Sequence, residues 1–234
     1  MCADDSIFLG LDTAGSSCSV AIVRAGKILA SRLEEMRRGQ SERLLPMINE
    51  VLSVTGLELS DMSGFAVTTG PGGFTGVRIG LAAAQGFALA CDKPLVGINN
   101  FDVLARAVPS EEKDSVESLT VLLDAKRAEL FAQCFTSELK PLTEPFAVSP
   151  DQLAPRLPSG KNLLVGDAVE QAEEFLAKAK IDYTVSRAIP RADASCLLLL
   201  ALEKGLFKQK AHRLHPLYLR APDVSLPKNH PTGK

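Results

Sequence analysis

Residues 7–23 read IFLGLDTAGSSCSVAIV, and this stretch decides the fold. An apolar run ends in Asp12, a turn of small and polar residues follows, and a second apolar run begins at Cys18. Short apolar runs bounded by turn residues are typical of buried strands. With a third strand expected over residues 28–34, the chain should open with a β-meander. Four polar side chains would share its first turn: Asp12, Thr13, Ser16 and Ser17.

The same order of features returns in the second half of the chain. Residues 119–124 form an apolar run that ends in Asp124, and a second apolar run follows a short polar turn. Because strand, acid, turn and strand occur twice, we infer an internal duplication of an α/β unit. The polar residues 111–118 are the expected linker between the halves. We therefore expect an N-terminal lobe over residues 1–108, a C-terminal lobe over 109–221 and a loose tail over 222–234.

A glycine-rich loop, GPGGFTG at residues 70–76, is the strongest local signal in the chain. It is not a P-loop, because Val-Arg follows Gly76 where a P-loop needs Lys and then Ser or Thr. It also misses the dinucleotide fingerprint, because Thr75 stands where the third Gly or Ala is required. The spacing favours a strand-to-helix turn with Thr75 as the helix cap. An anion bound at the helix N-terminus is the alternative.

Two helices are expected to follow the meander and the glycine loop. Residues 41–52 place apolar side chains on one helical face. In the helix expected over residues 77–91, Gly80 and Ala84 follow Gly76 at steps of four, so one stripe has almost no side chain. Such a stripe lets another backbone come close. It can pack on the protein's own sheet or on another subunit, and both can hold on different faces of the helix.

Composition and charge exclude several classes of protein. The 234 residues carry a formal net charge of −2, with 46% hydrophobic and 23% charged residues, as in an ordinary globular protein. A protein whose main function is to bind nucleic acid needs a surface rich in Lys and Arg. The near-neutral charge therefore argues against a dedicated nucleic-acid-binding protein. No apolar run reaches the roughly 18–20 residues of a membrane span. The acidic start, MCADD, argues against a signal peptide.

Cysteines and histidines indicate no metal or catalytic site. None of the five cysteines stands in a CxxC pair, so we expect reduced thiols in a cytoplasmic protein. No HExxH motif occurs, and the three histidines all lie near the C-terminus: His212, His215 and His230. A zinc hydrolase and a thiol nucleophile are therefore not expected.

Four segments closely resemble the TsaB (YeaZ) family. They are residues 7–23, 41–47 (SERLLPM), 69–86 (TGPGGFTGVRIGLAAAQG) and 216–220 (PLYLR). The resemblance implies the α/β actin-like ATPase (ASKHA) fold with two RNase H-like lobes. It also implies a role in making threonylcarbamoyladenosine (t6A) at position 37 of ANN-decoding tRNAs. In that pathway TsaD carries the transferase site, TsaB is its non-catalytic paralogue and dimerisation partner, and TsaE is an ATPase that joins them.

The resemblance also implies that this chain has no catalytic residue, no metal and no cofactor, and it implies which partners the chain binds. TsaD-like proteins bind a metal through an HxxxH pair, and Gln40 aligns with the single histidine that many TsaB sequences keep there. The family suggests a heterodimer with TsaD, a homodimer when the chain is alone, and contact with tRNA only through the complex. The expected TsaD interface comprises ten residues: Leu44, Leu45, Ile48, Val51, Leu52, Val77, Gly80, Leu81, Ala84 and Phe87.

A self-sufficient actin-like ATPase or kinase is the alternative from another class. It would use Asp12 and Asp124 with Mg-ATP, because strand-end carboxylates of sheet-based phosphotransferases hold metal and phosphate there. Each Asp can equally accept backbone N–H bonds within its own turn. We therefore treat four residues as candidates for a vestigial nucleotide site: Asp12, Thr13, Ser16 and Asp124. A glycoprotease would need a metal or a nucleophile with a base, and the sequence offers neither.

Overall fold

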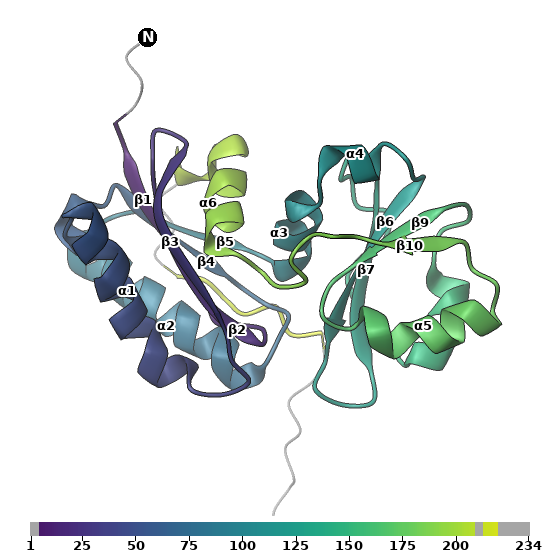
Figure 1. The fold of residues 1–234 in the computed structure, drawn as a ribbon. Helices are drawn as coiled ribbons and strands as arrows, with labels where there is room; N and C mark the ends of the chain where they lie inside the picture. The colour runs from purple at the N-terminus through teal and green to yellow at the C-terminus, as the bar shows by residue number, and fades with distance from the viewer. Residues whose placement is uncertain (1–4, 209–212, 220–234) are drawn as a thin grey trace, which may run out of the picture.

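The computed structural model describes residues 5–208 and 213–219, which form two lobes side by side (Figure 1). Each lobe contains one five-stranded sheet within the described residues. The strands of the first sheet are β1 (Ile7–Asp12), β2 (Ser17–Arg24), β3 (Lys27–Glu35), β4 (Gly64–Thr68) and β5 (Leu95–Ile98). Those of the second are β6 (Ser118–Asp124), β7 (Leu130–Thr136), β8 (Phe146–Val148), β9 (Asn162–Val165) and β10 (Tyr183–Val185).

Helices cover the sheets and join the lobes. They are α1 (Gln40–Thr55), α2 (Phe74–Cys91), α3 (Asn100–Ala107), α4 (Ser110–Lys113), α5 (Val169–Lys178) and α6 (Ala194–Glu203). Single 3₁₀ turns lie at Leu59–Asp61, Pro150–Gln152, Ala154–Arg156 and Leu206–Lys208.

The two sheets have the same topology. The order is β3-β2-β1-β4-β5 in the first and β8-β7-β6-β9-β10 in the second. In each lobe the first strand pairs antiparallel with the second and parallel with the fourth. This order, with three antiparallel strands extended by two parallel ones, is the RNase H-like arrangement. The internal duplication and the actin-like ATPase fold expected from the sequence are therefore confirmed.

The N-terminal sheet buries both faces, as the period of two along its strands requires. Leu9 and Leu11 of β1 pack towards α1 and α2, whereas Phe8 belongs to the apolar core on the opposite side, which includes α6. Gly10 faces α6 so closely that a Cβ there would lie 2.8 Å from Cγ of Leu198. The sheet is thus a middle layer, with α1 and α2 on one side and α6 on the other (Figure 1).

Two helices cross between the lobes. Helix α3 follows the N-terminal sheet in sequence but packs on β6 and β7, and α6 follows the C-terminal sheet but packs on β1, β2 and β4. Two ion pairs join α3 and α6, Arg106 with Glu203 and Lys204 with Asp102. A division of the chain at residues 108 and 109 thus separates the two sheets but not the helices that pack on them.

Several local expectations were wrong. Helix α2 begins at Phe74 with Gly73 as its N-cap, so Thr75 lies inside the first turn and is not the cap. Residues 150–156, where apolar spacing also predicts a helix, form two 3₁₀ turns instead. Strands β8 and β10 carry no strong signal, because they are only three residues long. The tail at 222–234 lies outside the described residues, as do His212 and His230.

Helix α2 is more apolar than the search for apolar runs suggested. Within the described residues it is the one helix long and apolar enough to cross a membrane by length and composition alone. It packs on the N-terminal sheet through Val77, Leu81 and Ala84. Seven of its 18 residues are exposed, whereas Ile79, Ala83, Phe87 and Cys91 are partly buried against the core.

Candidate functional site: an interlobe cleft and a helical face

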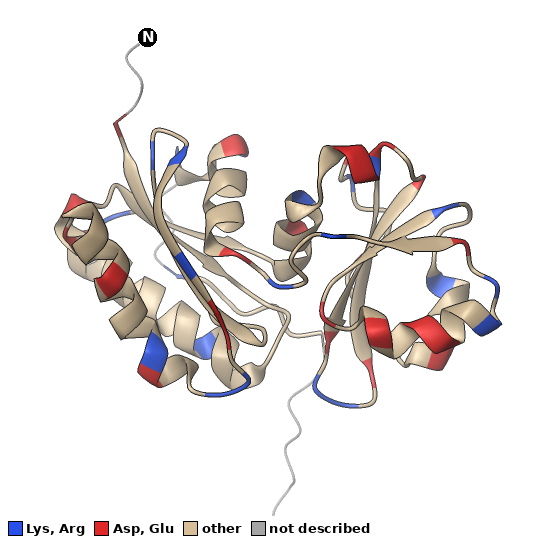
Figure 2. Cartoon of the chain, in the orientation of Figure 1, with Lys and Arg blue, Asp and Glu red and all other residues tan. Residues whose placement is uncertain are grey.

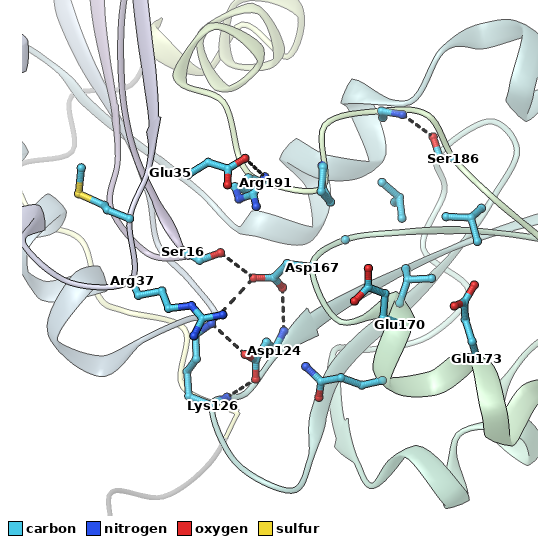
Figure 3. A pocket seen from close by; sticks show the side chains of 18 residues that line it. Ser16, Glu35, Arg37, Asp124, Lys126, Asp167, Glu170, Glu173, Ser186 and Arg191 are labelled. Atoms are coloured by element: carbon cyan, nitrogen blue, oxygen red, sulfur yellow. Dashed lines mark hydrogen bonds and ion pairs between the residues drawn. The ribbon is translucent and has the colours of Figure 1, made fainter.

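A cleft of about 1110 Å³ lies between the two lobes. The β1–β2 turn and the end of β3 form its N-terminal wall, and the ends of β6, β9 and β10 with the start of α5 form the other. Figure 3 shows that charged side chains of both signs line it. The acids are Glu35, Asp124, Asp167, Glu170 and Glu173, and the bases are Arg37, Lys126 and Arg191.

Polar contacts cross this cleft. The hydroxyl of Ser16 donates to Oδ2 of Asp167 at 3.1 Å, and Oδ1 of the same carboxylate accepts the backbone N–H of Asp124 at 2.9 Å (Figure 3). Lys126 pairs with Asp124 at 2.9 Å. A second bridge runs from Arg191 to Glu35 at 2.8 Å. Two of the predicted residues, Ser16 and Asp124, thus meet in one cluster.

Sequence reasoning missed the residue that holds this cluster together. Asp167 follows β9 in the turn before α5, and only the dipeptide Gly166-Asp167 at the end of an apolar run marked it. This is the strand-end position at which Asp12 and Asp124 were singled out. The same reasoning could have added Asp167 to the candidates.

Asp12 lies beneath the cleft and is completely buried. Its Oδ1 accepts a 2.5 Å hydrogen bond from Thr68 and a 3.3 Å bond from the backbone N–H of Ala14. Its Oδ2 has no partner among the described residues. Burial raises the pKa of Asp12 to about 6, with smaller contributions from the charges of Asp193 and Asp167. Asp12 is therefore not among the residues that line the cleft, whereas Asp124 lines it and is paired with Lys126.

The glycine loop packs against the β1–β2 turn. The N–H of Gly73 donates to the carbonyl of Ala14 at 2.8 Å, and the hydroxyl of Thr13 donates to the carbonyl of Gly76 at 2.7 Å. A Cβ at Gly72 or Gly76 would lie 2.2 Å from a carbonyl oxygen of the turn. The glycines thus permit close contact between two backbones. This geometry supports the structural interpretation of the loop over the anion site.

Metal and thiol chemistry find no support in the described part of the chain. Residues 5–208 and 213–219 contain no group of three or more His, Cys, Asp or Glu side chains able to hold a metal ion. Gln40, at the position aligned with the family histidine, donates to the carbonyls of Met36 at 3.2 Å and Gly15 at 3.4 Å. Burial raises the pKa of both Cys18 and Cys196 to about 12, which keeps these thiols protonated and unreactive.

The side-chain-poor stripe of α2 faces the protein itself. A Cβ at Gly80 would lie 2.7 Å from Oγ1 of Thr13 and 3.3 Å from Cγ2 of Val67. The expectation that this stripe receives a partner is therefore corrected, because it is occupied by the protein's own sheet and turn. Seven of the ten expected interface residues are buried in the same way: Leu44, Ile48, Val51, Val77, Gly80, Leu81 and Ala84.

The opposite side of the same two helices is open. Leu45 on α1 is 53% exposed and Leu89 on α2 is 78% exposed, whereas Leu52 and Phe87 are half-buried. Ala82, Gly86 and Ala90 are also exposed at steps of four along α2. Figure 2 shows almost no charge on α2, where Arg78 is the one charged residue. We call this surface, made of the exposed residues of α1 and α2, the α1–α2 face.

Two duplicated lobes around a polar cleft define a protein of the actin-like ATPase fold class. A family model described as "TsaD: tRNA N6-adenosine threonylcarbamoyltransferase" matches residues 27–188. The tRNA threonylcarbamoyladenosine biosynthesis protein TsaB of Haemophilus influenzae is 31% identical over 228 residues, covering 91% of this chain and 92% of that protein. The chain therefore belongs to the TsaB family.

Other relatives agree with this assignment. TsaB of Escherichia coli K12 is 35% identical over 123 residues, which cover 53% of this chain and 52% of that protein. Among solved structures, YeaZ from Pseudomonas aeruginosa superimposes with a TM-score of 0.73 at 26% identity, covering 92% of this chain and all of that one. The resemblance inferred from the sequence is thus confirmed.

Proposed function

We propose that this chain is the non-catalytic subunit of a tRNA N6-adenosine threonylcarbamoyltransferase complex, and that it activates TsaD by binding it through the α1–α2 face. The complex would make t6A at position 37 of ANN-decoding tRNAs in the cytoplasm, with TsaE as a further partner. This chain would touch tRNA only through the complex. Alone, it would use the same face to form a homodimer.

The exposed apolar surface of α2 is the observation that carries this proposal. This 18-residue helix carries one charged residue, and its exposed side includes Leu89 at 78% and Phe74 at 47% exposure. Large apolar side chains exposed on one side of a helix are typical of an interaction site. The small residues Ala82, Gly86 and Ala90 would let a partner helix approach closely. The pathway in the proposal is taken from the names of the relatives, which are tRNA threonylcarbamoyladenosine biosynthesis proteins.

The geometry gives little support to the ATPase alternative. Asp12 is buried without access to solvent, Asp124 is paired with Lys126, and the glycine loop uses Gly73 to bind the protein's own turn. Isothermal titration of the isolated chain with Mg-ATP tests this directly. Binding of Mg-ATP together with its hydrolysis by the isolated chain would contradict our proposal and support the ATPase alternative.

Association with TsaD is the test of the proposal. Leu45→Asp and Leu89→Asp each place a charge on the α1–α2 face, and we expect each to weaken binding to purified TsaD by at least tenfold. Leu142→Asp is the matched control, because Leu142 is 49% exposed on the C-terminal lobe, between β7 and β8. Unimpaired binding by both face variants would contradict the proposed surface.

Activity provides the second readout. Reconstituted t6A formation by TsaD should depend on this chain, and the two face variants should lower it in parallel with binding. If TsaD modifies tRNA at full rate without this chain, the proposed function is wrong.

A further inference from the structure

Three side chains form a preorganised cluster at the start of α2, which we call the Arg78 cluster: Phe74, Arg78 and Tyr218. The guanidinium carbon of Arg78 lies 3.6 Å from the ring centroid of Phe74. Nε of Arg78 donates to the hydroxyl of Tyr218 at 2.9 Å. The two rings stack, with centroids 5.5 Å apart and an interplanar angle of 23°. The guanidinium is therefore held by the Phe74 ring at one face and by the Tyr218 hydroxyl at Nε.

The backbone near Tyr218 fixes this arrangement. The N–H of Leu217 donates to the carbonyl of Thr69 at 2.8 Å, which ties the segment 213–219 to the strand that leads into the glycine loop. Leu214 packs beside Gly97, where a Cβ would lie 2.9 Å from Cδ1 of Leu214. These two contacts anchor the segment that carries Tyr218, while Phe74 and Tyr218 remain 47% and 40% exposed.

Arg78 keeps unused hydrogen-bond donors. Its Nε bonds to Tyr218, but within residues 5–208 and 213–219 no carboxylate pairs with its terminal nitrogens. A planar guanidinium whose terminal nitrogens have no carboxylate partner among the described residues is suited to bidentate binding of a carboxylate. Stacking on Phe74 has already removed much of the rotamer freedom that Arg normally loses on binding.

The position of Arg78 connects the cluster to the α1–α2 face. Arg78 is exposed and stands one helical step of four before Ala82, which is followed by Gly86 and Ala90 on the same side of α2. The face thus extends from the Arg78 cluster to Leu89 over roughly 20 Å, at 1.5 Å per residue. Tyr and Arg side chains are enriched among the residues that dominate binding energy at protein interfaces.

We propose that the Arg78 cluster is the polar anchor of the α1–α2 face, and that it binds a carboxylate of an Asp or Glu side chain on the partner protein. This inference rests on the proposed function, because the partner is the TsaD-type subunit. A protein carboxylate fits better than an RNA phosphate, because Arg78 is the only cation on α2, whereas RNA binding needs several neighbouring cations. The positive end of the α2 dipole strengthens the preference for an anion.

Binding of purified TsaD to the full chain tests the anchor. We expect Arg78→Ala to raise the dissociation constant at least tenfold at about 50 mM salt and to flatten its salt dependence. Arg78→Lys should retain part of the affinity, because lysine keeps the positive charge but cannot bind a carboxylate with two parallel hydrogen bonds. Tyr218→Phe, which removes the hydroxyl that orients Nε, should weaken binding by a few fold. Arg38→Ala is the matched control, since Arg38 is an exposed arginine in the β3–α1 loop.

The outcomes separate the anchor from the proposed function. If wild-type chain binds TsaD and Leu89→Asp abolishes binding, but Arg78→Ala binds as tightly as wild type, the anchor is wrong and the face stands. If Arg78→Ala lowers only the binding of tRNA to the assembled complex, the ligand is a phosphate and the anchor is again wrong. If wild-type chain does not bind TsaD, both proposals fail together. Circular dichroism melting of each variant excludes misfolding as the cause.

Discussion

Ser16 and Asp167 are joined by a 3.1 Å hydrogen bond that spans the cleft between the two lobes. Ser16 lies in the turn after β1, and Asp167 lies in the turn between β9 and α5 in the other half of the duplicated fold. The ion pair of Arg191 with Glu35 crosses nearby. These polar contacts hold the rim of the cleft, while the apolar core around α3 and α6 joins the lobes below it.

Removing the Ser16 hydroxyl should loosen the rim of the cleft. We expect Ser16→Ala to lower the free energy of unfolding by roughly 1 kcal/mol, because a hydrogen bond to a charged group is lost. Amide hydrogen exchange should become faster at residues 13–16 and 166–168. Ser137→Ala is the matched control, since Ser137 donates to Glu138 over the same 3.1 Å but within one lobe. Unchanged exchange at both turns would show that the bond does not restrain the cleft.

Replacing the buried Asp12 by its isosteric amide should stabilise the protein at neutral pH. Burial raises the pKa of Asp12 from 3.8 to about 6, so the folded state binds this proton more tightly than the unfolded state. Ionisation therefore costs stability on the order of 3 kcal/mol at pH 7, at about 1.4 kcal/mol per pKa unit. Asp12→Asn removes that cost, and its Oδ1 can still accept from Thr68 and Ala14.

Urea unfolding at several pH values measures the effect. The contribution of Asp12 to wild-type stability is fully present below pH 3.8 and is lost as the pH rises through about 6. The difference between Asp12→Asn and wild type should accordingly be small near pH 4 and large at pH 7.5. Asp114→Asn, at an exposed aspartate after α4, is the control. A variant less stable than wild type at pH 7.5 would contradict the explanation.

The sequence predicted the architecture because its signals are local and repeated. An apolar run that ends in an acid, as at Asp12 and Asp124, marks a strand edge wherever it occurs, and its repetition revealed the two lobes. No such signal shows that α3 packs on the C-terminal sheet and α6 on the N-terminal sheet. Each of these helices is apolar towards a core, and nothing in the spacing states which sheet supplies that core.

The candidate site was harder to predict because it depends on contacts between distant segments. Asp167 matters through Ser16, which lies 151 positions earlier in the chain. The spacing of Gly76, Gly80 and Ala84 revealed close packing, but the pattern is the same whether the neighbour is a sheet or a second protein. The orientation of α2 on β1 and β4 decided between them.

Two glycines of α2 provide a matched test of that decision. At Gly80 a new methyl group would lie 2.7 Å from Oγ1 of Thr13, so Gly80→Ala should break the bond from Thr13 to Gly76 and lower the free energy of unfolding by about 1–3 kcal/mol. At Gly86 nothing lies within 4 Å, so Gly86→Ala should raise it by up to about 1 kcal/mol through helix propensity. Thermal melting of the isolated chain measures both changes.

Leucine variants at the same two glycines extend the test to binding. Because Gly86 lies on the α1–α2 face, Gly86→Leu should leave the chain folded and block binding to TsaD, whereas Gly80→Leu should fail to fold. A folded Gly80→Leu variant of wild-type stability would refute the packing of this stripe on the protein's own sheet.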